Sequence, residues 1–121
     1  MKYEFYVHIN KQYGWRYLRV KVEDEKYSVI QNILTSDNWT PTLAQSIIDG
    51  VEESRTKSFA EAYTWGNEDV IVKSMEHGVF LWDMMARRAD KNHPKEQDLQ
   101  LAHDEFITFM QDFKKFIEEN Q

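Results

Sequence analysis

Histidine and carboxylate side chains are the most obvious chemical groups in this sequence, but they are not spaced as a catalytic or metal site. His103, Asp104 and Glu105 are consecutive. Consecutive residues of a helix point about 100° apart, so these three side chains do not converge on one site. His77 and His93 have no second histidine at the spacing of a helical metal-binding pair. We therefore predict no catalytic residue, no metal and no cofactor.

Nucleophile and phosphate-binding motifs are also missing from the sequence. The four glycines stand alone, so they cannot form the glycine-rich loop that cradles a phosphate. No serine lies in a nucleophile-elbow motif, and the chain has no cysteine for thiolate chemistry or disulfides. These observations favour a protein that binds a partner over an enzyme.

Short runs of carboxylates are the candidates for a binding role. Three such runs are predicted to contact a partner: Glu23, Asp24 and Glu25; Asp49, Glu52 and Glu53; Glu68 and Asp69. The middle run lies at the end of an expected helix, where negative charge opposes the helix dipole. A run of this kind can equally be a solvated helix end, and the sequence leaves both interpretations open.

The overall charge limits the kind of partner. Acidic residues outnumber basic ones 21 to 15, which gives a formal charge of −6. A nucleic-acid-binding protein is expected to carry a basic face, so this charge argues against direct nucleic-acid binding. It suits a basic protein partner, because opposite charges speed association. Aromatic residues make up 14% of the chain, and we expect some of them at the surface as interface anchors.

Length and hydropathy indicate one domain, 1–121, without a membrane segment. The chain has 121 residues, which is enough for a single domain. No run approaches the ~18 apolar residues of a membrane span, and the first residues do not resemble a signal peptide. We therefore expect a cytoplasmic protein that contacts no membrane. The sequence does not indicate its oligomeric state.

Two strands are expected at the start of the chain. Apolar and polar residues alternate from Tyr3 to Ile9 and again from Tyr17 to Glu23. Residues 10–14 form a turn of hairpin length between them, so the two strands should pair antiparallel. Their polar face would carry four side chains: Tyr6, His8, Tyr17 and Arg19.

Two helices are expected next. The first begins after Asp24, which can cap it, and is interrupted at residues 36–38. The second begins at Thr40 and Pro41, because threonine caps a helix and proline fits its first position. This second helix ends between residues 50 and 54.

Three further strands are expected in the second half of the chain. Residues 59–65 and 69–75 are rich in strand-forming side chains and flank a turn at 66–68. Residues 79–82 follow as a third strand. The alternative for this last segment is a short helix over 79–89.

The closing segment, residues 94–121, has the strongest helical pattern. Its apolar residues recur every three or four positions and form one stripe: Leu99, Ala102, Phe106, Met110, Phe113 and Ile117. Phe109 and Phe116 lie along the edge of that stripe. Leu101 is expected on the polar face, and His103 at the boundary between the faces. This helix is the expected cover for the sheet.

The order of these elements indicates the fold class. Residues 87–95 form a polar loop in which Arg87 and Arg88 are either solvated or paired with a nearby acid. The elements then follow the order β-β-α-α-β-β-β-α. Helices grouped between antiparallel strands predict an α+β domain, with an antiparallel sheet of about five strands and helices packed on one face.

The stretch from Glu61 to Lys73 carries a hairpin pattern with a family resemblance. It resembles the central hairpin of the YacL family, small acidic bacterial proteins without an established activity. Tyr3-Glu4-Phe5 is similar to that family's opening strand, and residues 104–116 are similar to its closing helix. The likeness covers about a third of the chain and includes no catalytic signature. It does not extend to residues 25–57 or 84–93.

In size, charge and composition the chain also resembles the immunity proteins of bacterial contact-dependent growth inhibition systems. These proteins block a toxin nuclease by binding it, and they share no common motif. The resemblance implies an immunity protein that neutralises a cognate toxin, a basic nuclease domain, by occluding its active site. The three carboxylate runs would then bind the toxin. The alternative is a housekeeping protein of the YacL type that binds an unknown partner.

Overall fold

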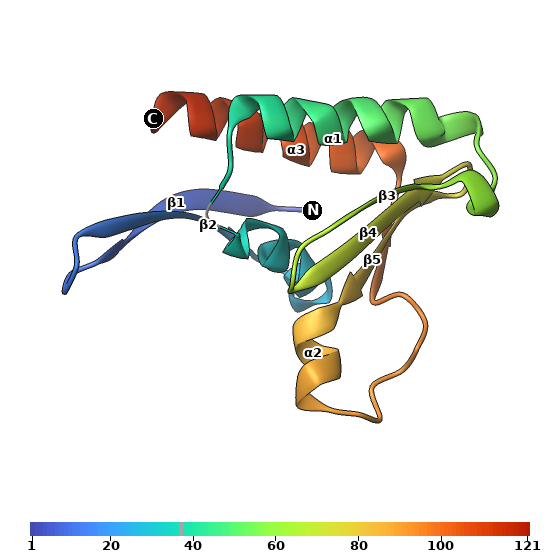
Figure 1. The fold of residues 1–121 in the computed structure, drawn as a ribbon, viewed down its shortest axis with the longest axis horizontal. Helices are drawn as coiled ribbons and strands as arrows, with labels where there is room; N and C mark the ends of the chain where they lie inside the picture. Colours follow the sequence, from blue (N-terminus) through green and yellow to red (C-terminus); the bar gives the residue numbers. More distant parts are fainter. Residues whose placement is uncertain (37) are drawn as a thin grey trace.

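Two antiparallel sheets lie beneath a pair of long helices in the computed structural model (Figure 1), which describes residues 1–36 and 38–121. The first sheet contains β1 (Tyr3–Asn10) and β2 (Trp15–Val22). The second contains, in spatial order, β3 (Tyr63–Gly66), β4 (Val70–Met75), β5 (Gly78–Asp83) and β6 (Leu99–Leu101). The predicted α+β class is confirmed, but the described residues form six strands in two sheets rather than about five in one.

The long helices are α1 (Pro41–Glu53) and α3 (His103–Glu119), which pack against each other and run in opposite directions (Figure 1). A 3-10 helix, η1 (Glu25–Thr35), joins β2 to the segment before α1. Three short helical segments complete the chain: η2 (Ser54–Thr56), η3 (Phe59–Glu61) and α2 (Met84–Ala89). Among the described residues, no helix has the length and apolar character needed to cross a bilayer.

Capping residues start η1 and α1 where the sequence predicts. The Asp24 carboxylate accepts a hydrogen bond from the Lys26 amide at 3.0 Å, which caps η1. The Thr40 hydroxyl accepts one from the Leu43 amide at 3.1 Å, and Pro41 occupies the first turn of α1. The break expected at 36–38 includes residue 37, which lies outside the described residues.

Gly50 lies inside α1, although glycine disfavours helices, because a larger residue would not fit beside Tyr63. The ring of Tyr63 packs against it so closely that an added Cβ would lie 2.3 Å from the ring. The glycine therefore allows β3 to approach the helix, and α1 continues to Glu53.

β1 and β2 form a long ribbon, residues 3–22, that extends beyond the rest of the molecule (Figure 1). The turn falls at residues 10–14 as predicted, with Gly14 at a φ of 73°, although β2 begins two residues earlier than expected. Tyr6 pairs with Arg19 and His8 with Tyr17, so the predicted polar face is confirmed. We call this the outer face of the ribbon.

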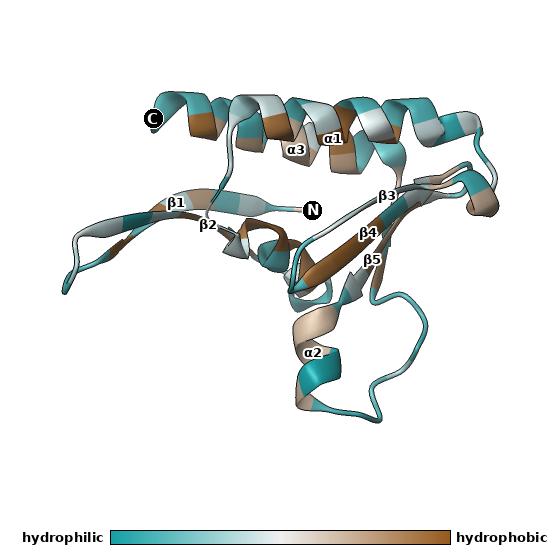
Figure 2. Cartoon of the chain, in the orientation of Figure 1, coloured by the Kyte–Doolittle hydropathy of each residue, from teal (hydrophilic) through white to brown (hydrophobic). Residues whose placement is uncertain are grey.

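Aromatic rings join the opposite, inner face of the ribbon to α3. The Phe5 ring lies 5.5 Å from that of Phe113 and 5.4 Å from that of Phe116. Phe106, Phe109 and Phe113 are all essentially buried. Figure 2 shows hydrophobic residues along β4 and on α1 and α3. The stripe predicted within α3 is therefore the centre of the core, where burial of each ring contributes about 1.5–3 kcal/mol.

The prediction that residues 94–102 belong to the closing helix is wrong. Leu99–Leu101 forms β6, which pairs with β5 through Leu81 and Val79. Leu101 is 2% exposed, whereas it was expected on a solvated helix face, and Ala102 is exposed instead of lying in the stripe. Leucines two residues apart fit either a strand or a helix edge, and the free edge of β5 favours the strand.

Two other boundaries differ from the predictions. The expected strand at 59–65 begins only at Tyr63, because Phe59–Glu61 is a 3-10 turn with Phe59 exposed. The expected loop at 87–95 begins inside α2, where the Asp83 carboxylate accepts a hydrogen bond from the Ala86 amide at 2.9 Å. The strand expected at 79–82 is confirmed as β5, so the helix over 79–89 is limited to its second half.

Candidate functional site

The three predicted carboxylate runs do not form one surface. The run that ends α1 lies at one end of the molecule, near the start of β3 (Figure 1). The run between β3 and β4 lies in the turn at the far end of the β3–β4 hairpin. The third run follows β2, at the base of the ribbon. Each run therefore has its own surroundings.

The run at the end of α1 gains two carboxylates from a distant part of the chain. Arg55 donates hydrogen bonds to Glu52 at 2.8 Å and to Asp104 of α3 at 2.5 Å. Asp104 is the second residue of α3, 49 positions away from Arg55. We call the surface that results the acidic end surface, made of Asp49, Glu52, Glu53, Asp104 and Glu105.

The antiparallel packing of α1 and α3 explains why acids can gather here. Negative charge at the C-terminus of α1 opposes that helix's own dipole. The N-terminus of α3 lies at the same end, with Asp104 and Glu105 in its first turn, where negative charge is favourable. The neighbouring helix and Arg55 thus compensate the charge that looked unfavourable from the sequence.

The acidic end surface remains charged and accessible. The hydrogen bond from Arg55 lowers the pKa of Glu52, against a smaller opposing effect of desolvation. The Asp104 side chain is 87% exposed. Asp49 and Glu53 are also exposed, and Asp49 accepts a hydrogen bond from Gln45 at 2.8 Å. Glu105 is half-buried and pairs with the N-terminal ammonium at 3.7 Å, so the other four carboxylates are the ones that can bind a cluster of cations.

Asp69 has a structural role that the sequence did not suggest. Its carboxylate accepts hydrogen bonds from the Thr35 hydroxyl at 2.5 Å and from the Arg88 guanidinium at 2.6 Å. These bonds, with Thr35 the larger influence, lower its pKa. They connect η1, the β3–β4 turn and α2, so we call the three residues the Asp69 latch.

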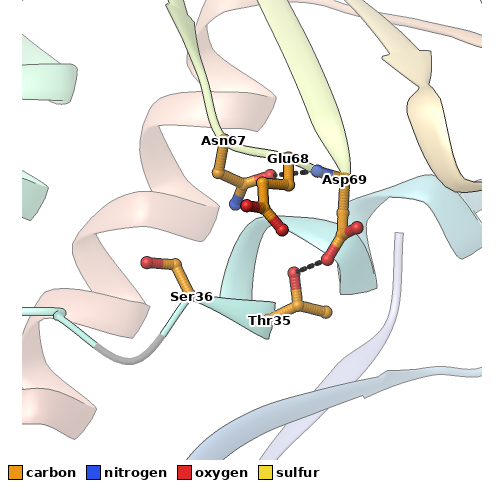
Figure 3. A pocket seen from close by; sticks show the side chains of 5 residues that line it. All are labelled: Thr35, Ser36, Asn67, Glu68 and Asp69. Carbon is orange, nitrogen blue, oxygen red and sulfur yellow. Dashed lines mark hydrogen bonds between the residues drawn. The ribbon is translucent and has the colours of Figure 1, made fainter.

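The hollow beside the latch is small and polar (Figure 3). It measures about 210 Å³ and is lined by Thr35, Ser36, Asn67, Glu68 and Asp69. Asn67 closes the turn by accepting hydrogen bonds from the amides of Asp69 and Val70. No hydrogen bond joins the Glu68 carboxylate to the other four side chains drawn in Figure 3. Of this run, Glu68 alone is available to a partner without breaking the latch.

In the run after β2, one carboxylate has a structural role and the other two are exposed. Asp24 caps η1, as described above, while Glu23 and Glu25 are exposed. Glu23 lines a hollow of about 380 Å³ with Tyr3, Glu4 and Lys21 at the base of the ribbon.

Two of the four histidines, His93 and His103, make structural contacts. His103 is half-buried at the start of α3, as its boundary position predicts, and its Nε2 lies 2.6 Å from the Met75 carbonyl oxygen. His93 lies 2.6 Å from Asp98, which also accepts a hydrogen bond from Arg87 at 2.6 Å. Within 1–36 and 38–121, no three His, Cys, Asp or Glu side chains are grouped to hold a metal ion.

The paired arginines stabilise α2 and the loop that follows it. Arg87 pairs with Asp98 and donates hydrogen bonds to the carbonyls of Pro94 and Glu96 at 2.9 Å. Arg88 pairs with Asp69. The interpretation of both as ion-pair partners is confirmed.

Charge is divided unequally between the ribbon and the rest of the chain, a feature that the net charge alone did not indicate. Residues 3–22 carry four basic residues and one acidic residue, a net charge of +3. The whole chain carries −6, so the residues outside the ribbon carry −9. The ribbon also exposes large side chains: Tyr6 (45%), Ile9 (55%), Tyr13 (59%) and Trp15 (58%). A charge count over each expected element would have shown this division.

No protein-family model matches the chain, and no curated protein or solved structure matches it either. The resemblance to the YacL family therefore stays a prediction, and the functional argument depends on the surfaces described above.

Proposed function

We propose that this protein is an immunity protein, which binds a cognate bacterial toxin with a basic nuclease domain and occludes the toxin's active site. The observation that carries the proposal is the acidic end surface. There the Arg55 guanidinium joins Glu52 of α1 to Asp104 of α3, while Asp49 and Glu53 of α1 and Glu105 of α3 lie on the same two helix ends. The protein acts as a binding module and performs no reaction.

The proposed mechanism is replacement of the nucleic-acid backbone. A nuclease binds its substrate phosphates with Lys and Arg side chains. Carboxylates on the acidic end surface would pair with those cations and keep the substrate out. Charge of opposite sign also accelerates the encounter, which suits an inhibitor that must act before the toxin does.

An exposed aromatic side chain follows these carboxylates in the chain. Phe59 is 58% exposed and begins η3, the second short helical segment after the end of α1. The Lys73 ammonium lies 5.2 Å from the centre of its ring. Stable interfaces commonly combine an exposed aromatic side chain with a charged rim, and they bury about 800 Å² on each partner.

Charge reversal at the acidic end surface tests this function. The partner to use is the cognate nuclease domain, which this proposal expects to be encoded immediately upstream. The double variant E52K/E53K should weaken binding by at least about 100-fold in interferometry, because unlike charge pairs become like pairs. Inhibition of nuclease activity should fall in parallel, and wild-type association should slow with added salt.

A matched control lies at the opposite end of α3. Glu118 and Glu119 are exposed, and E118K/E119K changes the net charge by the same amount. It should alter the affinity by no more than about threefold, since these residues lie more than a Debye length from the acidic end surface. Wild-type binding by a folded E52K/E53K variant would contradict the proposal.

A further inference from the structure

β1 leaves one long edge of the ribbon without a partner strand. It pairs with β2 along all eight of its residues, and no other described strand pairs with it. The N–H and C=O groups along such an edge can pair with another strand. Proteins usually protect these edges with charged side chains, proline, a bulge or a very short strand.

The other sheet edges have these protections, whereas β1 has only Glu4 near its start. β3 has four residues and β6 has three, so both are short. The open edge of β2 carries Arg16, Arg19 and Lys21, and the Val22 amide donates to the side chain of Gln31 at 3.2 Å. In contrast, residues 5–10 of β1 contain no Lys, Arg, Asp, Glu, Pro or Gly.

We propose that a second copy of this chain pairs with β1 antiparallel, across a two-fold axis, to give a continuous four-stranded sheet. The order of strands would be β2, β1, then β1 and β2 of the second copy. A two-fold contact closes on itself, so it yields a dimer and not a filament. This inference is independent of the toxin-binding function, because it concerns the ribbon alone.

The side-chain alternation restricts the register of this pairing. The inner faces of both ribbons must lie on the same side, so paired residue numbers must add to an even number. A sum of 12 places Tyr6 next to Tyr6 of the second copy, at the two-fold axis. On the outer face it then places His8 next to Glu4, which is a favourable cross-strand pair.

The same register covers the exposed apolar residue of the inner face. Ile9 is 55% exposed because it lies near the tip of the ribbon, beyond the aromatic contacts that Phe5 makes with α3. In the dimer it would lie beside Tyr3 of the second copy. Tyr6, 45% exposed in the single chain, would pack against its own counterpart.

Of the two possible strand directions, the distribution of charge along the ribbon favours the antiparallel one. The tip carries Lys11 and Arg16 and no acid, whereas Glu4 and Glu23 line the hollow at the base beside Lys21. Antiparallel pairing brings the tip of one ribbon to the base of the other. Each strand spans only about 27 Å, so the interface is small, and we expect a dissociation constant in the micromolar range.

Sedimentation equilibrium of the protein alone, from about 1 µM to 1 mM, tests this proposal. Wild type should pass from monomer to dimer. Y6K should raise the dissociation constant at least tenfold, because two lysines would meet at the axis. Y6E should do the same, and an equimolar mixture of Y6K and Y6E should recover a dimer that neither forms alone. Amide exchange in β1 should slow as the wild-type concentration rises.

Trp15→Ser is the matched control. Trp15 is exposed on the same face as Tyr6 but belongs to β2, one strand away from the proposed contact. W15S should dimerise within about twofold of wild type. Wild type that stays monomeric at 1 mM overturns the proposal, as does a dimer that W15S abolishes and Y6K leaves intact. Because no toxin is present, neither result bears on the acidic end surface.

Discussion

The acidic end surface and the ribbon are two exposed regions built in opposite ways. The acidic end surface joins residues 49 positions apart, through Arg55 and Asp104, and exists only because α1 and α3 pack side by side. The ribbon is one continuous segment whose two faces follow from alternation alone. The first surface is assembled by the packing of two helices, whereas the second is defined by its own hairpin, although its inner face also packs on α3.

The charges of the two regions separate their roles. The ribbon carries +3 and the remaining residues carry −9, so a basic partner of the kind proposed would be attracted to the residues outside the ribbon and repelled from the ribbon. The net charge of −6 hides this division. Four predictions, from the largest expected effect to the smallest, test how far the two regions are independent.

Phe113→Ala should damage both regions at once. Phe113 is fully buried, and its ring packs against Phe5 of the ribbon and, at 5.0 Å, against Trp39. The loss of the ring should reduce the free energy of unfolding by about 3–5 kcal/mol in chemical denaturation. Glu118→Ala on the exposed face of α3 should stay within about 0.5 kcal/mol of wild type. A similarly small effect of F113A would contradict the assignment of the core.

Asp69→Asn should destabilise the part of the molecule outside the ribbon, where Asp69 connects η1, the β3–β4 turn and α2. It removes the charge that Thr35 and Arg88 bind, which should cost about 1–2 kcal/mol at pH 7. The folded pKa of Asp69 lies below its ordinary value, so its contribution is present above about pH 4 and is lost as the pH falls through the folded pKa. The difference in unfolding free energy between wild type and D69N should therefore shrink as the pH falls from 7 through the folded pKa of Asp69. A difference that stays the same as the pH is lowered would refute the latch.

Arg55→Ala should increase the rate at which the acidic end surface associates with the proposed partner. It removes the guanidinium that pairs with Glu52 and Asp104. Exposed ion pairs contribute little to stability, so the melting temperature should change little. Association with a basic nuclease should become several-fold faster in stopped-flow measurements, because the surface is more negative. Slower association would mean that Arg55 itself contacts the partner.

Trp15→Ser should have the smallest effect on stability, although tryptophan is the largest side chain. Its ring is 58% exposed and stacks on that of Tyr13 at 4.9 Å, away from the core. The free energy of unfolding should stay within about 0.5 kcal/mol of wild type in urea denaturation. A loss above about 2 kcal/mol would show that the ribbon tip stabilises the fold.

Local patterns predicted the elements whose signals lie within a few residues. The alternation in residues 3–22 predicted the ribbon, its turn and its outer face. The Thr40-Pro41 and Asp24 caps predicted where α1 and η1 begin, since a cap is a contact between close neighbours. The aromatic stripe of α3 predicted the core from its spacing alone.

What the sequence did not determine depends on contacts between distant segments. Leu99–Leu101 fits a helical stripe until the open edge of β5 is present to receive it as β6. The roles of Asp69 and Arg88 follow from the packing of η1, the β3–β4 turn and α2. The acidic end surface likewise required α3 to run antiparallel to α1. Local sequence sets the period, caps and turns of each element, while tertiary packing decides which charges are paired and which stay exposed to a partner.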